Sequence, residues 1–454
     1  MTQPTGRVLI VRKAVLLFTL VLLCANQAAA TSPVKLSLQE AQKMAVEYGY
    51  EMRTASAELQ IAERQIWETT AAGLPQVSAS IGYNYFLDIP TSLIPAEFFG
   101  GEPGEFTEIQ FGTQHNMTAT ASLEQLIFDG QYIVGLRAAR IYRDLAEQSL
   151  QKSMLEVRKT VKETYYLALL ASENLQIVRQ NLQVMEKWLW ETERMLEAGV
   201  TDPINVDQLQ LAVSNIRNGI SSLERQRLLT MNLLKYQMGL DLQTHIELTD
   251  DFESLFEKAL SEMAVTEQLD KAQHIDYLLA GSREAMSLMV LRREQSSYLP
   301  SLSASFIRQE MAMRDGFNFF DSSRSWFPAT YFAVNLNIPI FSSGMRSSQV
   351  QQARLELEKS RIAREQISKV LELEMQEALA TLDTAQEQYL NEKSNLELAS
   401  RILTRTNIMF REGMASSLEL TQANDQLLTS QTNYLNAMFE LLNAQNKLEK
   451  ALGR

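Results

Sequence analysis

Residues 408–422 read Ile-Met-Phe-Arg-Glu-Gly-Met-Ala-Ser-Ser-Leu-Glu-Leu-Thr-Gln, and within this stretch one very long helical pattern ends and another begins. Gly413 is the only glycine within residues 345–452, so the first helix is expected to end there. Ser416 or Ser417 can cap the helix that follows, because a serine hydroxyl accepts a hydrogen bond from the free amides of a first helical turn. The stretch therefore predicts a helical hairpin with its turn at Gly413.

A matching stretch lies in the first half of the chain at residues 194–210, Arg-Met-Leu-Glu-Ala-Gly-Val-Thr-Asp-Pro-Ile-Asn-Val-Asp-Gln-Leu-Gln. Gly199 is expected to close a long helix here. Thr201 or Asp202 then caps the next helix, and Pro203 occupies its first position, where a missing amide proton costs nothing. The sequence thus predicts two hairpins of the same design.

Two short motifs also occur twice and in the same order: LPQVSAS at 74–80 with LPSLSAS at 299–305, and LIFDG at 126–130 with PIFSSG at 339–344. Recurrence of all three landmarks predicts an internal duplication. We divide the chain into a first structural repeat at 31–240, a mixed segment at 241–266 and a second repeat at 267–454.

Residues 1–30 have the composition of a secretory signal peptide: three basic residues, an apolar run at 14–23 and Ala28-Ala29-Ala30. The apolar run is too short for a membrane span. Leu23 precedes Cys24 where a lipoprotein has a small residue, which argues against lipidation. Cleavage would remove three basic and no acidic residues, so the formal charge would change from −13 to −16.

The remaining chain has no cysteine, which excludes disulfides and thiol chemistry, and its negative charge argues against a nucleic-acid partner. His115, His245 and His274 are far apart in the sequence, with His115 in a predicted surface loop, and no Gly-rich phosphate loop is visible. We therefore expect no catalytic residues, metal site or cofactor. An enzyme is the least favoured of three readings.

Four stretches alternate between apolar and polar side chains, as strands with one apolar face do: 77–85, 117–128, 301–306 and 332–340. Residues 87–116 and 313–330 between them are read as loops. Helical patterns cover 37–72, 131–198, 203–238, 267–297, 345–411 and 416–452. The two longest contain about 67 residues and would extend about 100 Å. Each equals two shorter helices placed end to end, so a pair of shorter helices can lie beside each long one.

The last helix carries an apolar seam with heptad spacing, formed by Tyr434, Ala437, Leu441, Ala444, Leu448 and Ala451. Leu435, Met438 and Leu442 form a second apolar stripe beside it. Two stripes predict two neighbouring helices, as in a closed ring.

Four strands cannot close a barrel, and an open sheet in lipid leaves backbone groups unpaired. Two chains would give a filled barrel, whereas three chains give twelve strands and room for a lumen. The sequence therefore predicts a mainly α protein with a membrane β-barrel formed by three chains, each with long helical hairpins and four strands.

This order of elements, with the paired motifs and the segment Gly-Met-Ala-Ser-Ser-Leu-Glu-Leu-Thr-Gln-Ala at 413–423, resembles the TolC family of outer-membrane efflux proteins over essentially the whole chain after residue 30. The resemblance implies a homotrimeric outer-membrane channel whose long helical hairpins form a trimeric α-barrel in the periplasm. It implies a passive exit duct of a tripartite efflux or type I secretion system, opened by a periplasmic adaptor and an inner-membrane pump of RND or ABC type. Outer-membrane lipid would surround the strands.

The resemblance also implies a periplasmic gate at the hairpin turns. Glu419 and Asp207 stand where the family places acidic side chains, and threefold symmetry would make each a carboxylate ring that favours cations. Each can equally be a solvated charge or a partner of the helix dipole. Phe410 fits a family aromatic position, but Ala415 and Gln422 replace an arginine and an acid that tie the gate shut in some members.

Adaptor contact would fall on the turns themselves, at Gly199, Val200, Gly413 and Met414. Tyr83, Tyr85, Tyr331 and Phe332 are candidates for an aromatic girdle at the membrane surface. The competing reading is a periplasmic coiled-coil adaptor or scaffold without a pore. It explains the long helices but not the alternating strands. The cargo cannot be read from the sequence.

Overall fold

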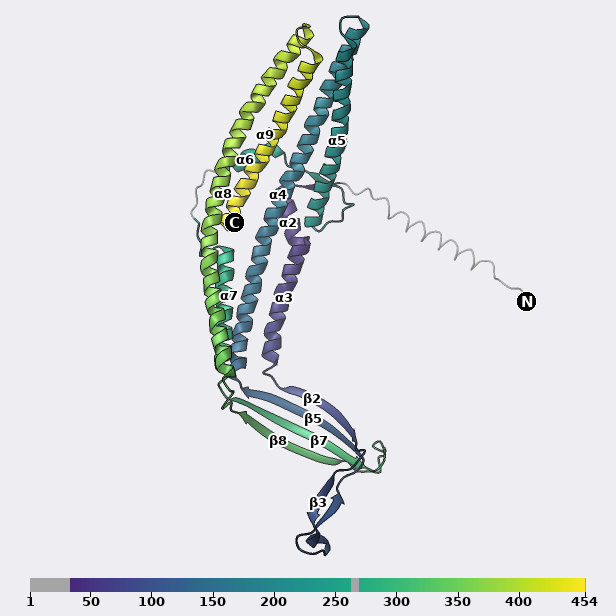
Figure 1. Cartoon of the computed structure of the whole chain (residues 1–454), viewed down its shortest axis with the longest axis vertical. Coiled ribbons are helices and arrows are strands. Elements are labelled where there is room, and N and C mark those ends of the chain that lie inside the picture. The colour runs from purple at the N-terminus through teal and green to yellow at the C-terminus, as the bar shows by residue number, and fades with distance from the viewer. Residues whose placement is uncertain (1–32, 263–268, 454) are drawn as a thin grey trace, which may run out of the picture. The chain divides into compact units, whose positions relative to one another are not determined.

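The computed structural model describes residues 33–262 and 269–453. The predicted signal peptide at 1–30, with Cys24, lies outside the described residues. The chain divides into two compact units, whose elements are labelled in Figure 1. We call them the hairpin unit, which consists of the described residues within Met1–Arg53, Ser153–Leu269 and Leu373–Arg454, and the sheet unit, Thr54–Lys152 with Asp270–Glu372.

The hairpin unit contains the two predicted hairpins. One is formed by α4 (Gly130–Glu197) and α5 (Pro203–Gln237), the other by α8 (Met345–Arg411) and α9 (Ser417–Ala451). The first parts of α4 and α8 belong to the sheet unit. All four helices are confirmed to within about one residue of their predicted ends.

Smaller elements complete the hairpin unit: a parallel pair of β1 (Val34–Leu36) with β6 (Ile246–Leu248), and helices α2 (Leu38–Tyr48) and α6 (Phe252–Glu262). Tyr165 of α4 lies buried beneath them, with its hydroxyl 2.9 Å from the Leu36 carbonyl and 3.0 Å from Asp250 Oδ2. The same carboxylate accepts a 2.7 Å bond from the Leu38 amide. Burial, with Asp250 adding to it, raises the pKa of Tyr165, so the hydroxyl stays a donor.

The packing of α9 confirms both predicted apolar stripes. Ala437, Leu441, Ala444 and Ala451 of the seam are buried, and Leu435, Met438 and Leu442 of the second stripe are buried too. Within the hairpin unit, α9 contacts α5 and α6. A helix with two apolar stripes therefore has two helical neighbours within this chain.

The sheet unit contains a four-stranded antiparallel sheet in the order β2-β5-β7-β8 (Figure 1). Its strands are β2 (Gln76–Tyr85), β5 (His115–Phe128), β7 (Ser301–Arg314) and β8 (Phe327–Asn337). Helices α3 (Tyr50–Ala71) and α7 (Ile275–Ser296) precede β2 and β7. The order helix, two sheet strands, long helix, shorter helix thus occurs twice, while the exact repeat boundaries at 31–240 and 267–454 stay a prediction.

One face of the sheet carries a row of large apolar side chains and the other is richer in Ser, Thr and Asn, because successive side chains of a strand point to opposite faces. On the apolar face, Val77 pairs with Leu123, Leu123 with Phe306, and Phe306 with Phe332. The opposite face carries paired Ser, Thr and Asn residues: Ser78 with Ser122, Ser80 with Thr120, Ser303 with Asn335 and Ser301 with Asn337.

Charged and aromatic residues vary this alternation. Arg308 and Glu310 lie on the otherwise apolar face and form a 2.5 Å ion pair. Tyr83 shares that face with Phe332, whereas Tyr331 belongs to the opposite face, so the four girdle candidates do not form one group.

The predicted helix over 37–72 is interrupted at Gly49, although its capping box of Ser37 and Glu40 is confirmed. Gly49 has an extended backbone, with φ −59° and ψ 143°. A Cβ at this position would lie 2.3 Å from the Ala45 carbonyl oxygen and 2.9 Å from that of Gln237. The break is therefore set by the close approach of α5, which the periodicity of one helix does not report.

The loop assignments were too long. Residues 87–116 contain a two-stranded antiparallel extension, β3 (Thr91–Pro95) and β4 (Phe106–Gln110), with a 3-10 helix, η2 (Ala96–Phe99), between them. His115 is the first residue of β5 instead of a loop residue, and its Nδ1 lies 2.7 Å from the Tyr83 hydroxyl. The helix predicted at 267–297 begins at Ile275, and the strand predicted at 332–340 runs over Phe327–Asn337. Pairing with neighbours, rather than the local pattern, sets these ends.

Candidate functional site at the ends of the two helical hairpins

The two hairpin turns have the same backbone. Gly199 and Gly413 both have φ +72°, a left-handed conformation that L side chains rarely adopt. The Val200 amide donates to the Met195 carbonyl at 3.0 Å, and the Met414 amide donates to the Met409 carbonyl at 2.8 Å. Each turn is thus a Schellman motif, in which the glycine lets the chain satisfy the last carbonyls of the long helix.

The helices that follow are capped differently. Asp202 caps α5 by accepting a 3.0 Å bond from the Ile204 amide, with Pro203 in the first turn. Ser416 caps α9 and forms a capping box with Glu419, in which each side chain bonds the backbone amide of the other residue. Of the two predicted caps at each turn, the structure uses Asp202 and Ser416.

The carboxylate of Glu419 is engaged in this cap. Its Oε2 lies 2.7 Å from the Ser416 amide nitrogen and 3.1 Å from the Ser416 hydroxyl. These bonds, the amide first, hold the pKa of Glu419 below its usual value, so the group is ionised at neutral pH. Asp207, one turn into α5, is exposed and makes no hydrogen bond or ion pair within residues 33–262 and 269–453.

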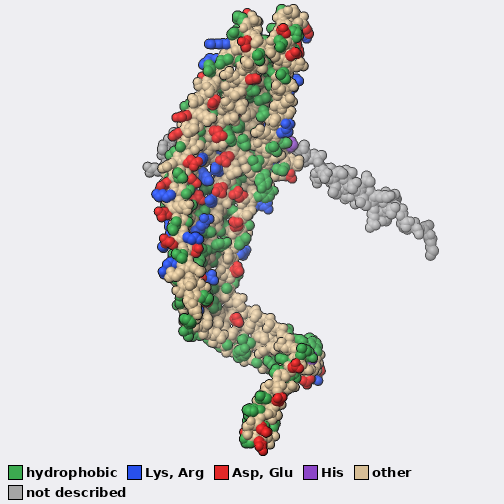
Figure 2. Space-filling view, viewed as in Figure 1, with side chains coloured by type: hydrophobic (Ala, Val, Ile, Leu, Met, Phe, Trp, Pro, Cys, Tyr) green, Lys and Arg blue, Asp and Glu red, His purple; other side chains and the backbone are tan. Residues whose placement is uncertain are grey.

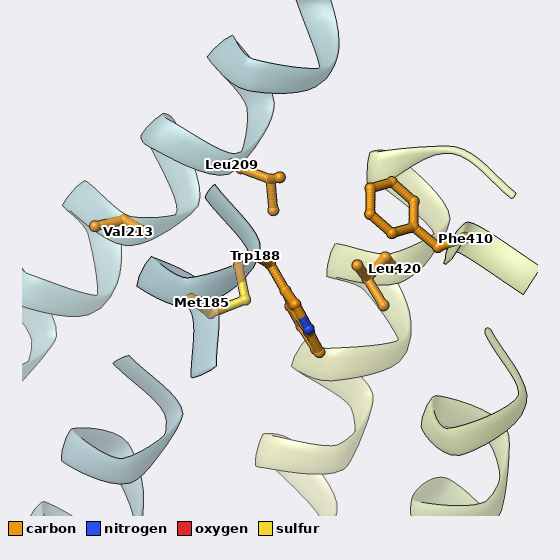
Figure 3. Close-up of a cluster of buried hydrophobic side chains, with 6 residues drawn as sticks. All are labelled: Met185, Trp188, Leu209, Val213, Phe410 and Leu420. Atoms are coloured by element: carbon orange, nitrogen blue, oxygen red, sulfur yellow. The ribbon is translucent and has the colours of Figure 1, made fainter. Parts of the chain in front are cut away.

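Phe410 lies in a buried cluster instead of at an open surface. All four helices contribute to this cluster, which is drawn in Figure 3 and consists of Met185, Trp188, Leu209, Val213, Phe410 and Leu420. Phe410 is 8% exposed and Leu420 is fully buried. The cluster joins the two hairpins just behind their turns.

A set of hydrogen bonds between the hairpins was not predicted. Ser417 is fully buried, and its hydroxyl lies 2.7 Å from Asn205 Oδ1 and 2.6 Å from Gln208 Oε1. Further from the turns, the amides of Asn181 and Asn424 bond each other at 2.8 Å and 3.3 Å. These contacts connect α9 with both helices of the first hairpin.

The sequence carried only a weak signal for this network. The sequence predicts either Ser416 or Ser417 as the cap of α9. Because Ser416 takes that role, the hydroxyl of Ser417 needs another partner. Asn205 and Gln208 are three residues apart and therefore share one face of α5. Nothing local indicates that this face meets Ser417.

The predicted tip residues occupy the turns. Val200 and Met414 are 73% and 65% exposed, which is high for apolar side chains. No Cβ contact lies within 4 Å of Gly199 or Gly413, so only backbone conformation requires glycine there. The hairpin ends thus combine a buried interior with an apolar exposed tip.

Comparisons with known proteins identify the family to which this chain belongs. Residues 43–240 and 290–454 match the family described as outer membrane efflux protein, and the chain belongs to this family. It is 21% identical over 407 residues to the probable outer membrane lipoprotein SilC of Salmonella typhimurium, covering 89% of this chain and 82% of SilC.

Solved structures share the fold. The outer membrane protein VceC of Vibrio cholerae is 17% identical, with a TM-score of 0.67 over 92% of this chain and 96% of VceC. The CmeC outer membrane channel of Campylobacter jejuni is 15% identical, with a TM-score of 0.70 over 92% of this chain and 85% of CmeC. The expectation of a TolC-like fold is confirmed.

The chain is therefore an outer-membrane efflux protein whose helical part lies in the periplasm, and the alternative of an adaptor or scaffold without a pore gains no support. Channels of this family are trimeric and work with adaptors and inner-membrane pumps, and the family is not one of enzymes.

Within residues 33–262 and 269–453, no helix is both long enough and apolar enough to cross a membrane. The same residues contain no cluster of His, Cys, Asp or Glu side chains that could hold a metal ion.

Proposed function

We propose that three copies of this chain assemble into a passive exit duct, with the sheets closed into a twelve-stranded barrel in the outer membrane. The observation that carries this proposal is the four-stranded sheet with β2 and β8 at its edges. In lipid, each unpaired backbone group costs several kcal/mol. Pairing of β8 in one copy with β2 in the next removes every edge once the ring closes.

The two faces of the sheet support three copies. The row formed by Val77, Leu123, Phe306 and Phe332 suits contact with lipid. The opposite face, with Ser78 2.8 Å from Ser122 between their hydroxyl oxygens, suits water. Eight strands enclose a barrel filled by side chains, whereas twelve leave a lumen that a polar face can line.

The hairpin ends are proposed as the periplasmic entrance, with Asp207, Phe410 and Glu419 as gate residues. In a trimer each carboxylate would form a ring, which favours cations at a constriction. Phe410 would act from the buried cluster by holding the second hairpin against the first. The bonds of Ser417 with Asn205 and Gln208 would hold the entrance closed in place of the missing arginine at Ala415.

Gly199, Val200, Gly413 and Met414 are proposed as the contact with a periplasmic adaptor. The exposed apolar side chains of Val200 and Met414 support this role, because binding would remove them from water. The duct supplies no energy of its own. An adaptor and an inner-membrane pump, of RND or ABC type, would shift the balance between closed and open hairpin ends.

Single-particle imaging of the detergent-extracted full chain tests the assembly. The proposal predicts threefold symmetry and a twelve-stranded transmembrane ring. A twofold particle, or a water-soluble rod without a membrane-embedded end, would overturn it. The class averages decide between these outcomes without knowledge of the cargo.

A further inference from the structure

Large apolar side chains are exposed at all four junctions between helices and strands in the sheet unit. The four residues are Leu74 before β2, Ile127 near the end of β5, Leu299 before β7 and Phe341 after β8, with exposures of 44%, 55%, 50% and 85%. Figure 2 shows hydrophobic side chains gathered where the helices meet the strands. Exposed apolar groups at one level on four separate segments indicate contact with something apolar.

Arginines lie on the helices directly beyond this level. Arg346 is the second residue of α8, Arg292 and Arg293 lie close to the end of α7, and Arg137 is two turns into α4. At 1.5 Å per residue, all four lie within about 10 Å of the helix end that faces the sheet, and so does Arg64 of α3. We call these four residues the arginine collar.

The guanidinium groups of the collar have no hydrogen-bond or ion-pair partner within the described part of the sheet unit. Some arginines further along the same helices are paired: Arg143 lies 3.2 Å from Asp144 and from Glu147, Arg361 lies 3.3 Å from Glu284, and Arg364 lies 3.0 Å from Glu284.

Three carboxylates lie at the level of the collar and offset part of its charge. They are Glu68, Asp129 and Glu294. Asp129 already accepts bonds from the Gln131 and Tyr132 amides at 2.7 Å and 3.0 Å, so it caps α4. The helix ends next to the sheet therefore keep an excess of positive charge, although the formal charge of the whole chain is −13.

The residue type is also selective. The basic residues at the level of the collar are all arginines. The lysines of the sheet unit lie further along the helices, at Lys152, Lys271, Lys359 and Lys369. Arginine binds phosphate oxygens through two parallel N–H donors, which a lysine ammonium cannot do. Its aliphatic stem also packs on apolar surface while the charge reaches outward.

We propose that the collar binds the phosphate groups of anionic phospholipids in the periplasm-facing leaflet of the outer membrane. This proposal rests on the proposed function, in which the sheet spans that membrane. The exposed apolar junctions would lie at the edge of the hydrocarbon layer, which is about 30 Å thick within a bilayer of about 40–45 Å. The collar then falls in the headgroup layer, and the bilayer supplies the partners that the chain does not.

The opposite end of the sheet differs in charge. Residues 87–114, which include β3 and β4, contain five acidic residues and no lysine or arginine. Phosphate groups would be repelled there. The helical end of the sheet is therefore better matched to phosphate than the β3–β4 extension at the opposite end, which would help to fix the height and direction of the sheet in the membrane.

The test uses the full chain in detergent, with Arg292→Gln, Arg293→Gln and Arg346→Gln combined in one variant. Arg361→Gln is the matched control, because Arg361 lies on the same helix as Arg346 but is paired with Glu284. The melting temperature is measured after addition of phosphatidylglycerol or phosphatidylcholine. Phosphatidylglycerol should raise it by several degrees more than phosphatidylcholine in the natural chain and the control, and this difference should disappear in the triple variant.

An equal effect of the two lipids on the natural chain, or an unchanged difference in the triple variant, overturns the proposal. Dissociation of the folded triple variant into single chains before lipid is added also overturns it, since the arginines would then bind a neighbouring copy. If the triple variant is not recovered from membranes, Arg292→Gln and Arg346→Gln are measured singly, and each should lose part of the difference. Single-channel conductance is expected to stay unchanged, which separates this proposal from that of the duct.

Discussion

The two hairpin ends share a backbone and differ in how they use their polar side chains. Both turn at a glycine with φ +72° and close with the same pair of backbone bonds. After the second turn, the first acid, Glu419, is bound in the cap of its own helix. After the first turn, Asp202 caps the helix and Asp207 remains free in solvent.

Glu419 and Asp207 are both predicted from the sequence to be gate residues, but their surroundings differ. Glu419 fixes the start of α9, so its charge is held in place by the backbone. Asp207 has no such task, and its side chain is exposed. Between them, Asn205 and Gln208 of the first end reach Ser417 of the second, so the two ends are in direct contact.

The largest expected effect is that of Phe410→Ala. Removal of a buried aromatic side chain from the cluster of Figure 3 should cost about 3–5 kcal/mol in the free energy of opening the hairpin ends. Hydrogen exchange of the amides in both turns measures this cost. Met409→Ala is the matched control, because Met409 precedes Phe410 and is 44% exposed. Equal protection in the two variants would show that the cluster does not join the ends.

Ser417→Ala should have the next largest effect, about 1–3 kcal/mol, because it removes the buried hydroxyl whose one proton the amide oxygens of Asn205 and Gln208 share. Hydrogen exchange of the backbone amides should become faster at both hairpin ends. Ser416→Ala removes the neighbouring hydroxyl, and its cost of about 0.5–2 kcal/mol should be confined to the start of α9. If both variants affect only the second end, the network does not couple the hairpins.

Acid should loosen the second hairpin end before the first. The folded pKa of Glu419 is lowered, so its contribution is fully present above its ordinary value of 4.5 and is lost as the pH falls through the folded value. Exchange at the start of α9, corrected for its intrinsic pH dependence, should therefore rise below about pH 4.5. Glu419→Gln keeps a residue that can complete a capping box and should remove this pH dependence. Persistence of the effect in Glu419→Gln would assign it to another group.

The smallest effect on stability is expected for Asp207→Asn, since an exposed side chain without partners contributes little to folding. Its effect on transport should be larger than that of Glu419→Gln. In planar bilayers, the preference for cations over anions should fall in Asp207→Asn and fall less in Glu419→Gln. No change in either variant would remove both carboxylates from the gate.

Local chemistry made much of the fold predictable. The turns at Gly199 and Gly413 follow from a backbone conformation that glycine adopts easily, and both long helices follow from uninterrupted periodicity between such glycines. The strands follow from alternation, because one face meets an apolar surface and the other does not. Each of these signals lies within a few residues.

Contacts between distant segments were not predictable. Ser417 is 212 residues from Asn205 and 209 from Gln208, so no local pattern reports their bonds. The break at Gly49 depends on the end of α5, and the β3–β4 extension lies in a stretch rich in glycine and proline. Candidate gate residues could be named by resemblance, but only the structure places Phe410 in a buried cluster and Glu419 in a cap.

Single-channel conductance of Ser417→Ala in planar bilayers tests the central claim, that bonds between the hairpins hold the entrance closed. Ser214→Ala is the control, because Ser214 is an exposed serine of α5 near the same end. The account predicts that Ser417→Ala opens more often and conducts more than the natural chain, while Ser214→Ala matches the natural chain. Conductance of Ser417→Ala equal to that of the natural chain would contradict the account.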